Sequence, residues 1–445
     1  MRRLHFTILI ILLLVSEAFY LLLYSHLAER LFLFIVVSLV NSRMFVLAWL
    51  LIRKENIPSP KNFLLVLLLF GMMFRISLIF LKPIASDDIY RYIWDGKVQA
   101  YGINPYRYSP DDPALEGLRS TVLPEEINFP QLKTIYPPFA EWTFLLTYRL
   151  VGESLVGFKA VMLLAECITI FLLLLLLHEL NIPQINIALY VLCPLPIMQF
   201  MVDGHLDAIG FPFLLLFILL WLRGKRLHSY IALGISVISK LFPVVFLPAV
   251  MSFEKGGRKL PAGLIPTGIL VAAYLPYYLW NGSPLESFRL FSMNWASNGS
   301  VFEIIWSLVL NDQTAHVIAT ALLVTWLGYV AYCNKSIIEK IYLSLFGFFL
   351  LSSTVHPWYV AWLAVLLPLH LRWSGIAFVT LVNLAQVPLV EYVATGVWNQ
   401  APWMLLLEYL PVIGLFVWEG SNKEAHHSPI ITCWADAETE MKESS

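Results

Sequence analysis

The feature that most constrains this chain is the recurrence of apolar runs that are about as long as a bilayer is thick. A transmembrane helix needs about 20 apolar residues, and runs of roughly that length recur from residues 4–24 to residues 402–418. Of the 445 residues, 59% are hydrophobic and 13% are charged. Because a bilayer offers no water to bond exposed backbone groups, such spans must be helical. The sequence predicts an all-α polytopic membrane protein and excludes a soluble enzyme.

We expect about twelve transmembrane helices. The predicted spans are 4–24, 31–52, 63–82, 154–178, 185–202, 206–222, 261–280, 314–333, 341–355, 358–371, 374–395 and 402–418. The chain has five short segments rich in Lys and Arg, and such segments usually lie on the cytoplasmic side of a membrane. All five fall on one side only if residues 229–251 enter the bilayer and return to the side from which they came. Lys240 and Pro243 in the middle of that segment favour a re-entrant pair of half-helices.

This topology divides the chain into four regions and places both termini in the cytoplasm. The regions are three N-terminal helices (1–82), an outer-face loop with an acidic motif and interfacial helices (83–153), a transmembrane bundle (154–420) and a polar cytoplasmic tail (421–445). In a bacterium the membrane would be the inner one. The four cysteines show neither CxxC pairs nor the spacing of metal ligands, so we interpret them as core residues.

A strongly polar segment, residues 86–112, lies between two apolar runs. It contains five aspartates, three basic residues and five tyrosines. Ser86 is predicted to cap a helix that runs to about Tyr101, where Gly102 stops it. Asp87 and Asp88 would then lie in the first turn of that helix.

Two interpretations of these aspartates stay open. Carboxylates are favourable at a helix N-terminus, and Asp87 can pair with Arg91 at i, i+4. The neighbouring aromatic residues suit a bilayer interface as well as the apolar faces of sugars, but an interface does not explain the acids beside them. Successive helical residues diverge by about 100°, so one aspartate can act as a base while the other holds a cation or a hydroxyl. Further substrate-binding candidates in this segment are Tyr92, Trp94 and Asp95.

Other polar residues are expected on the same face of the membrane. Asp203, His205 and Asp207 sit at the end of a span, where they are either a solvated cap or ligands of a substrate or a divalent ion. Lys240 lies within an apolar segment, and a buried lysine usually needs an anionic partner, such as a phosphate. His356 in "HPWY" and Tyr136 in "IYPPF" complete the candidate substrate contacts.

Several of these motifs together resemble a known family. They are "SDDIYRYIWDGKVQAYGINPYRYSPDDP", "TIYPPFAEW", "VDGHLDAIGFPFLLL", "SKLFPVVFLP" and "HPWYVAWLAVLLPL". The segment from about residue 63 to residue 371 resembles the GT-C class of membrane glycosyltransferases. Within that class it is most similar to bacterial mannosyltransferases that use a polyprenyl-phosphate sugar, and more distantly to the first mannosyltransferase of GPI-anchor synthesis.

The resemblance implies a GT-C-like bundle and inverting transfer of a hexose, mannose in the nearest members, from a polyprenyl-phosphate donor to a glycan or lipid acceptor on the outer face. It places the catalytic motif on Asp87 and Asp88 and phosphate contacts on Arg91 and Lys240. In many of these enzymes the acidic loop follows the first span, whereas here it follows the third, as an added N-terminal helical hairpin would explain.

The chemistry of the residues agrees with this resemblance. A placed carboxylate can take the acceptor proton, and positive groups or a metal ion can stabilise a phosphate that leaves as an anion. A lipid-linked-sugar flippase or a secondary transporter is the alternative, although we find no internal repeat of the kind common in transporters. The sugar, the acceptor, the oligomeric state and a requirement for a divalent metal ion stay open, and nothing points to nucleic acid.

Overall fold

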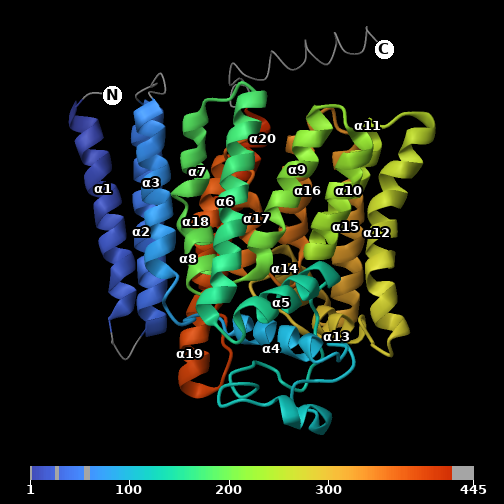
Figure 1. The fold of residues 1–445 in the computed structure, drawn as a ribbon. Helices are drawn as coiled ribbons and strands as arrows, with labels where there is room; N and C mark the ends of the chain where they lie inside the picture. The colour runs from blue at the N-terminus through green and yellow to red at the C-terminus, as the bar shows by residue number, and fades with distance from the viewer. Residues whose placement is uncertain (1–2, 26–29, 55–60, 423–445) are drawn as a thin grey trace.

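The structure is a computed structural model that describes residues 3–25, 30–54 and 61–422. Within these residues all regular structure is helical, and β pairing is limited to isolated bridges of Thr354 with Ser297 and Asn298. The tail predicted at 421–445 lies outside the described residues except for its first two positions. The helices run side by side and form one bundle (Figure 1). The prediction of an all-α membrane protein is confirmed.

Seven described helical segments are long and apolar enough to cross a membrane, or eight if a bent pair counts as one span. Single helices account for most of them: α1 (Arg3–Leu21), α2 (Arg30–Lys54), α6 (Leu155–Glu179), α12 (Lys259–Leu279), α15 (Asp312–Tyr332) and α20 (Pro402–Ser421). The remaining one is formed by α18 (Trp373–Leu381), η7 (Val382–Gln386) and α19 (Val387–Thr395).

Four of the twelve predicted spans form shorter helices, so the count of twelve is not confirmed. The range 63–82 becomes α3 (Lys61–Leu78), and 206–222 divides into η4 (Leu206–Ile209) and α9 (Phe211–Leu222). The ranges 341–355 and 358–371 become α16 (Ile337–Leu351) and α17 (Pro357–Ala364). Apolar composition alone does not set helix length, because a helix that packs among other helices can end inside the bundle.

The range 185–202 is the bent pair, in which α7 (Ala188–Val191) and α8 (Pro194–Met201) meet after η3 (Gln184–Ile187) at an angle of 49°. Pro194 has no N–H to continue the helix, so carbonyl groups are freed at the break. Arg75 on α3 donates to the carbonyl of Val191 at 2.8 Å and pairs with Glu166 at 2.8 Å, both side chains being fully buried. Arg75, held by Glu166, thereby supplies a hydrogen-bond donor to a backbone carbonyl at the break, inside the bundle.

The segment predicted to be re-entrant contains α10 (Arg226–Ser239), η5 (Phe242–Phe246) and α11 (Leu247–Phe253). Arg226 at its start pairs with Glu254 just after its end at 3.4 Å, and Trp221 at the end of α9 packs on Phe253. The segment therefore enters the bundle and returns to the end from which it came. Lys240 follows α10 and occupies the turning point.

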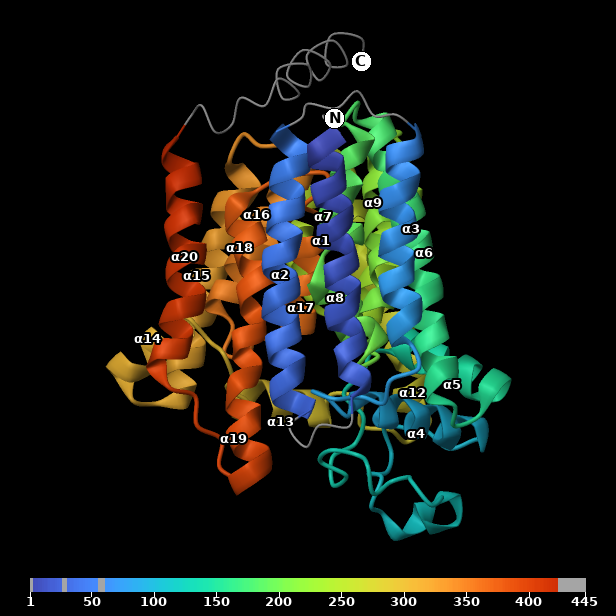
Figure 2. The same ribbon diagram turned by 90° about the vertical axis from the view of Figure 1, so that its left-hand side faces the viewer.

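Four short helices gather at the other end of the bundle, together with the irregular residues 102–137 (Figures 1 and 2). They are α4 (Asp88–Ala100), α5 (Pro138–Val151), α13 (Glu286–Asn294) and α14 (Val301–Val309). We call this the site end. Helix α1 begins and α20 ends at the opposite end (Figure 2).

Helices α4 and α5 pack against each other across the site end (Figure 1). A Cβ on Gly96 would lie 2.4 Å from the carbonyl oxygen of Phe144, so only glycine permits this approach. Gly102 ends α4 as predicted, with a φ of 76° and its N–H donating to the carbonyl of Gln99. The side chain of Asn104 then donates to the carbonyls of Tyr277 and Trp280 and ties the chain to the end of α12.

The irregular residues are fastened to the short helices by polar contacts. Lys97 on α4 pairs with Glu153 at 2.6 Å, and Glu153 also accepts a hydrogen bond from Ser120 at 2.9 Å. The 3-10 helix η2 (Pro113–Leu118) is capped by Asp112, whose side chain accepts from the N–H of Ala114. The remaining 3-10 helices, η1 (Leu22–Tyr24) and η6 (Gly256–Arg258), adjoin α1 and α12.

Candidate functional site

A cavity of about 1090 Å³ begins at the N-terminus of α4 and continues between the helices of the bundle. Its polar wall carries Asp87, Asp88, Arg91, Lys240 and His356. These residues come from three regions that are far apart in the sequence. The prediction that they share one site therefore agrees with where the structure places them.

A second, mostly apolar wall of the cavity is formed by helices of the bundle. The wall includes His316, Ala319, Thr320 and Leu323 of α15 and Leu389, Tyr392 and Val393 of α19. Both sets follow the i, i+3, i+4 spacing of a single helix face. Phe348 and Leu351 of α16 and Phe242 of η5 complete this wall. The cavity thus joins charged groups to a mostly apolar groove.

The two aspartates lie at the start of α4, although the cap differs from the prediction. Asp87 itself is the N-cap residue and Asp88 is the first helical residue, while the Ser86 hydroxyl accepts from the N–H of Asp88 at 3.3 Å. The predicted pair between Asp87 and Arg91 is wrong, because Arg91 pairs with Asp95 instead. Asp87 is left facing Asn128, which donates a hydrogen bond to its carboxylate.

The environment favours the protonated form of both carboxyl groups. Burial raises the pKa of Asp87 to about 6, and the nearby Glu126 adds to the effect. Burial and then the charge of Asp87 raise the pKa of Asp88 to about 7, against the opposing influence of Lys240. A carboxylate with a pKa near neutrality is matched to proton transfer at physiological pH. Of the two, Asp88 is the better placed for that task.

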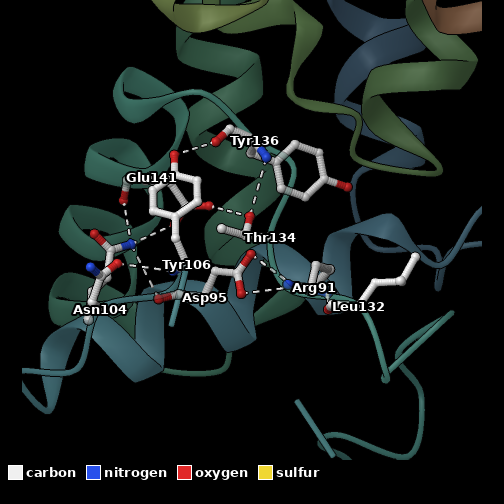
Figure 3. A network of polar contacts seen from close by, with 9 residues as sticks. Arg91, Asp95, Asn104, Tyr106, Leu132, Thr134, Tyr136 and Glu141 are labelled. Carbon is white, nitrogen blue, oxygen red and sulfur yellow. Dashed lines mark hydrogen bonds and ion pairs between the residues drawn. The ribbon is translucent and has the colours of Figure 1, made fainter. Parts of the chain in front are cut away.

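Arg91 is held by Asp95 one helical turn away and by the carbonyl of Leu132 at 2.8 Å (Figure 3). Its Nη2 has no hydrogen-bond partner among the described residues, although the side chain lines the cavity. A planar guanidinium can bind two oxygens of a phosphate at once. The Nη2 nitrogen is itself buried, so the side chain lines the cavity through its other atoms, while Asp95 is buried behind it and does not line the cavity.

Behind Asp95 lies a buried polar network that joins α4, α5 and residues 132–136 (Figure 3). Glu141 is fully buried, accepts from Thr134 at 2.6 Å and from Gln99 at 2.8 Å, and is hydrogen-bonded to Asp95. Burial and the charge of Asp95 raise the pKa of Glu141 well above its ordinary value. A protonated Glu141 can donate to Asp95, which leaves the Asp95 carboxylate to fix Arg91.

Lys240 pairs with Asp207 on η4, with 3.2 Å between Nζ and Oδ2. Trp362 on α17 donates to the other oxygen of Asp207 at 2.8 Å. Lys240 also lies 4.6 Å from the ring centre of Tyr359 and lines the cavity. The anionic partner expected for this lysine is therefore Asp207, which itself is buried and does not reach the cavity.

Asp203 is fully buried and holds the turn that precedes the two aspartates. One carboxylate oxygen accepts from the N–H groups of Ile84 and Ala85 at 2.9 and 3.0 Å. Lys159 on α6, also fully buried, donates to the carbonyls of Leu81 and Val202. Sequence reasoning missed Lys159, whose only signal was a lysine inside an apolar run.

His205 stacks on Trp358 at 3.7 Å between ring centres, and its Nδ1 is 3.6 Å from the Asp88 carboxylate. Burial, with the charge of Lys240, lowers the pKa of His205 well below its ordinary value. His356 also stacks on Trp358, at 4.4 Å between ring centres, and burial next to Lys240 lowers the pKa of His356 to about 3. Both imidazoles are therefore neutral. His205 makes no hydrogen bond to Asp88 and, unlike His356, does not line the cavity.

The remaining candidates divide between core and cavity. Tyr92 is buried and stacks on Phe144, with 4.7 Å between the ring centres. Trp94 is also buried, and neither residue lines the cavity. Their placement supports a packing role rather than contact with a substrate. Tyr136 does line the cavity and contacts Tyr92 edge to face.

The structure does not gather the acids and histidines into a metal-binding group. Among the described residues no set of three or more His, Cys, Asp and Glu side chains is arranged to hold a metal ion. The three candidate ligands of the "DGHLD" motif turn to different partners: Asp203 to backbone N–H groups, His205 to Trp358 and Asp207 to Lys240. Gly204, with a φ of 75°, makes this divergence possible.

No match is found among curated proteins. The crystal structure of ArnT from Cupriavidus metallidurans bound to undecaprenyl phosphate is 14% identical in sequence and has a TM-score of 0.46, with 81% of this chain and 72% of that chain covered. The profile of the family described as "Alpha-(1->6)-mannopyranosyltransferase, N-terminal domain" matches residues 14–254, more than half of the chain. The resemblance to bacterial mannosyltransferases is thereby confirmed, and the chain belongs to the α-(1→6)-mannopyranosyltransferase family.

Proposed function

We propose that this protein transfers mannose from a polyprenyl-phosphate donor to a hydroxyl of a glycan or lipid acceptor on the outer face of the membrane, with inversion at the anomeric carbon. The family supports the reaction class and favours mannose as the sugar. The donor is inferred from the shape and chemistry of the cavity, and the outer face from the Lys and Arg bias of the loops.

The observation that carries this proposal is the continuity of the cavity. A polyprenyl-phosphate sugar has a polar head, a phosphate and a long hydrocarbon chain. The cavity offers two carboxyl groups and two cations together with a mostly apolar groove along α15, α16 and α19. Such a groove would hold the first part of the chain, while the rest remains among lipids, which accounts for a catalytic site built at the end of a membrane bundle.

The reaction needs one proton acceptor and stabilisation of one leaving group. The acceptor oxygen forms a bond to the anomeric carbon as its proton passes to a carboxylate, which contributes about 10²- to 10⁴-fold in rate. The bond from that carbon to the phosphate oxygen breaks, and its electron pair leaves with the phosphate. Arg91 and Lys240 both line the cavity and would stabilise the negative charge. An α-linked product formed by inversion requires a β-linked donor.

We assign the base to Asp88. The sequence alone left the choice between Asp87 and Asp88 open, and Asp88 has the pKa closer to neutrality and lies near Lys240. Asp87 contacts Asn128 on the irregular segment and lies on that side of the cavity. It would hold a hydroxyl of the acceptor while Asp88 takes the proton.

The test is transfer by purified protein reconstituted in liposomes. Polyprenyl-phosphate mannose, glucose and galactose are offered with a membrane extract as acceptor, and the anomeric configuration of the product is read by NMR. We expect mannose to be transferred with inversion, and Asp88→Asn to lower kcat at least about 100-fold. The matched control is Asp111→Asn, because Asp111 is an exposed carboxylate outside the cavity.

Two outcomes would contradict the proposal. If Asp87→Asn and Asp88→Asn both keep full activity, neither aspartate is the catalytic base and the assignment is wrong. Movement of the intact lipid-linked sugar across the liposome membrane, without consumption of the donor, would instead establish the flippase alternative, for which the same cavity would serve as a binding site.

A further inference from the structure

Asn298 connects the wall of the cavity to the last helix of the bundle. It is buried and does not itself line the cavity. Its side-chain amide donates to the carboxylate of Glu408 at 3.0 Å and to the carbonyl of Val355 at 3.2 Å. Its carbonyl accepts from the hydroxyl of Tyr409 at 2.7 Å, and its N–H donates to the side chain of Gln400 at 2.9 Å. Segments that are far apart in the sequence therefore meet at this one residue.

The backbone and the contacts at position 298 both favour asparagine. The φ of Asn298 is 59°, in the left-handed region, which asparagine tolerates better than most side chains do. An amide carries N–H donors together with an oxygen acceptor, and the Asn298 oxygen accepts from Gln400 at 3.2 Å. Aspartate has nearly the same shape, but it has no N–H to donate to Glu408 or Val355.

The residues next to Asn298 belong to the cavity wall. Residues 295–297 line the cavity, and so do residues 352–354. The N–H of Val355 donates to the carbonyl of Ser297 at 2.9 Å, which joins these two segments. Because Asn298 also holds the carbonyl of Val355, it fixes the second segment two residues before α17 begins.

Helix α17 carries the contacts that hold Lys240. The ring centre of Tyr359 lies 4.6 Å from the Lys240 Nζ. Trp362 donates to Asp207, whose other carboxylate oxygen pairs with Lys240. The position of α17 against the wall therefore sets where the ammonium group lies in the cavity. A path of direct contacts and short chain segments thus leads from Asn298 to a cation that lines the cavity.

Glu408 is the unusual member of the group around Asn298. It lies on α20, which is long and apolar enough to cross a membrane, and it is fully buried. One of its carboxylate oxygens accepts from Asn298, and the other has no hydrogen-bond partner among the described residues. An ionisable residue inside a span is costly and commonly marks a function. The described residues of α20 do not line the cavity, so Glu408 reaches the site through Asn298.

We propose that Asn298 and Glu408 are positioning residues for the transfer reaction. Glu408 holds Asn298, and Asn298 holds the wall and α17 so that Lys240 meets the phosphate of the donor. This inference rests on the proposed function and adds two residues that lie outside the cavity. If the contact only held the bundle together, its loss would lower stability. A positioning role predicts instead a loss of turnover and of phosphate binding in a protein that stays folded.

The first experiment replaces Glu408 in the full-length protein in two ways. Leucine is favourable inside a bilayer but accepts no hydrogen bond, so Glu408→Leu should lower kcat about 10- to 100-fold without lowering the Tm. Glu408→Gln keeps an oxygen that accepts from Asn298, and its kcat should return to within about twofold of the wild type. The matched control is Glu17→Leu, because Glu17 is a carboxyl group of α1 that also has one oxygen without a partner among the described residues and does not line the cavity.

The second experiment tests whether the effect passes through Lys240. Binding of undecaprenyl phosphate, which requires no transfer, is measured for Glu408→Leu and for Asn298→Gly. Glycine tolerates the backbone conformation of Asn298 and removes only its side chain. Each change should weaken binding about tenfold in the wild type. In a Lys240→Gln background each should weaken binding by less than about twofold, because changes that act through one group are not additive.

Three results would overturn the inference. The first is wild-type kcat and wild-type affinity for undecaprenyl phosphate in Glu408→Leu. The second is a loss of equal size with and without Lys240, because the wall would then act on the site by another route. The third is a Glu408→Leu protein that does not fold, which would show that the contact only holds the bundle together. If the wild type consumes no donor, the proposed function fails, and the binding comparison still decides whether Asn298 and Glu408 position Lys240.

Discussion

At the scale of single residues, Asp88 is the proposed catalytic base, and its ionisation lowers the stability of the folded protein. An aspartate in an unfolded chain loses its proton at a pKa of about 3.9, whereas burial raises the pKa of Asp88 to about 7 in the folded protein. Between these two values the folded protein binds more protons than the unfolded chain. Its stability therefore falls as pH rises through this window, and the full loss is reached above pH 7.

Replacement of Asp88 by Asn should thus stabilise the protein at high pH while it abolishes transfer. We expect Asp88→Asn to raise the Tm by several degrees at pH 8, because no buried negative charge has to form, and to change it little below pH 4. Thermal unfolding in detergent between pH 4 and pH 8.5 measures this. Asp111→Asn serves as the control, and an equal gain in that variant would show that the effect is not specific to the buried site.

At the scale of secondary structure elements, the packing of α4 on α5 fixes the direction in which the aspartates point. Gly96 permits this packing, since a Cβ there would meet the backbone of Phe144. Gly96→Ala should force the helices apart and destabilise the protein by about 1–3 kcal/mol, although alanine is the better helix former by about 1 kcal/mol. Because α4 would tilt, transfer should fall as well.

The Gly96 prediction is checked by thermal unfolding together with kcat. Gly117→Ala is the matched control, because no atom lies within 4 Å of a Cβ built at Gly117. A Gly96→Ala variant as stable and as active as the wild type would mean that α5 can move without disturbing the site.

At the scale of the whole molecule, the proposed sidedness depends on the re-entrant segment from Arg226 to Glu254. Its two ends meet, so the loop that follows it must face the side opposite to the site end. In a background without native cysteines, we expect Gly117→Cys to react with a membrane-impermeant thiol reagent in intact cells. Gly257→Cys should react only after permeabilisation. Both positions have open space for the new side chain, and the reverse labelling pattern would place the site in the cytoplasm.

The sequence by itself determined the features that depend on neighbours along the chain. Apolar runs specified helices, because a bilayer leaves the backbone no other partner. Gly102 specified the end of α4, and the proline and lysine within 229–251 specified a segment that turns back. The five motifs taken together were sufficient to indicate the family. Of the candidate site residues that they contain, about half line the cavity and the others are buried beside it.

Only the tertiary structure decided which charged groups meet. Arg91 is four residues from Asp87 and four residues from Asp95, and in the folded protein it pairs with Asp95 while it also donates to the carbonyl of Leu132. Lys159 meets groups 78 and 43 residues away, a distance over which no local pattern carries information. The choice between Asp87 and Asp88 likewise depended on burial and on Lys240. Electrostatic partners are set by proximity in space, and that proximity arises from the packing of the whole bundle rather than from any one segment.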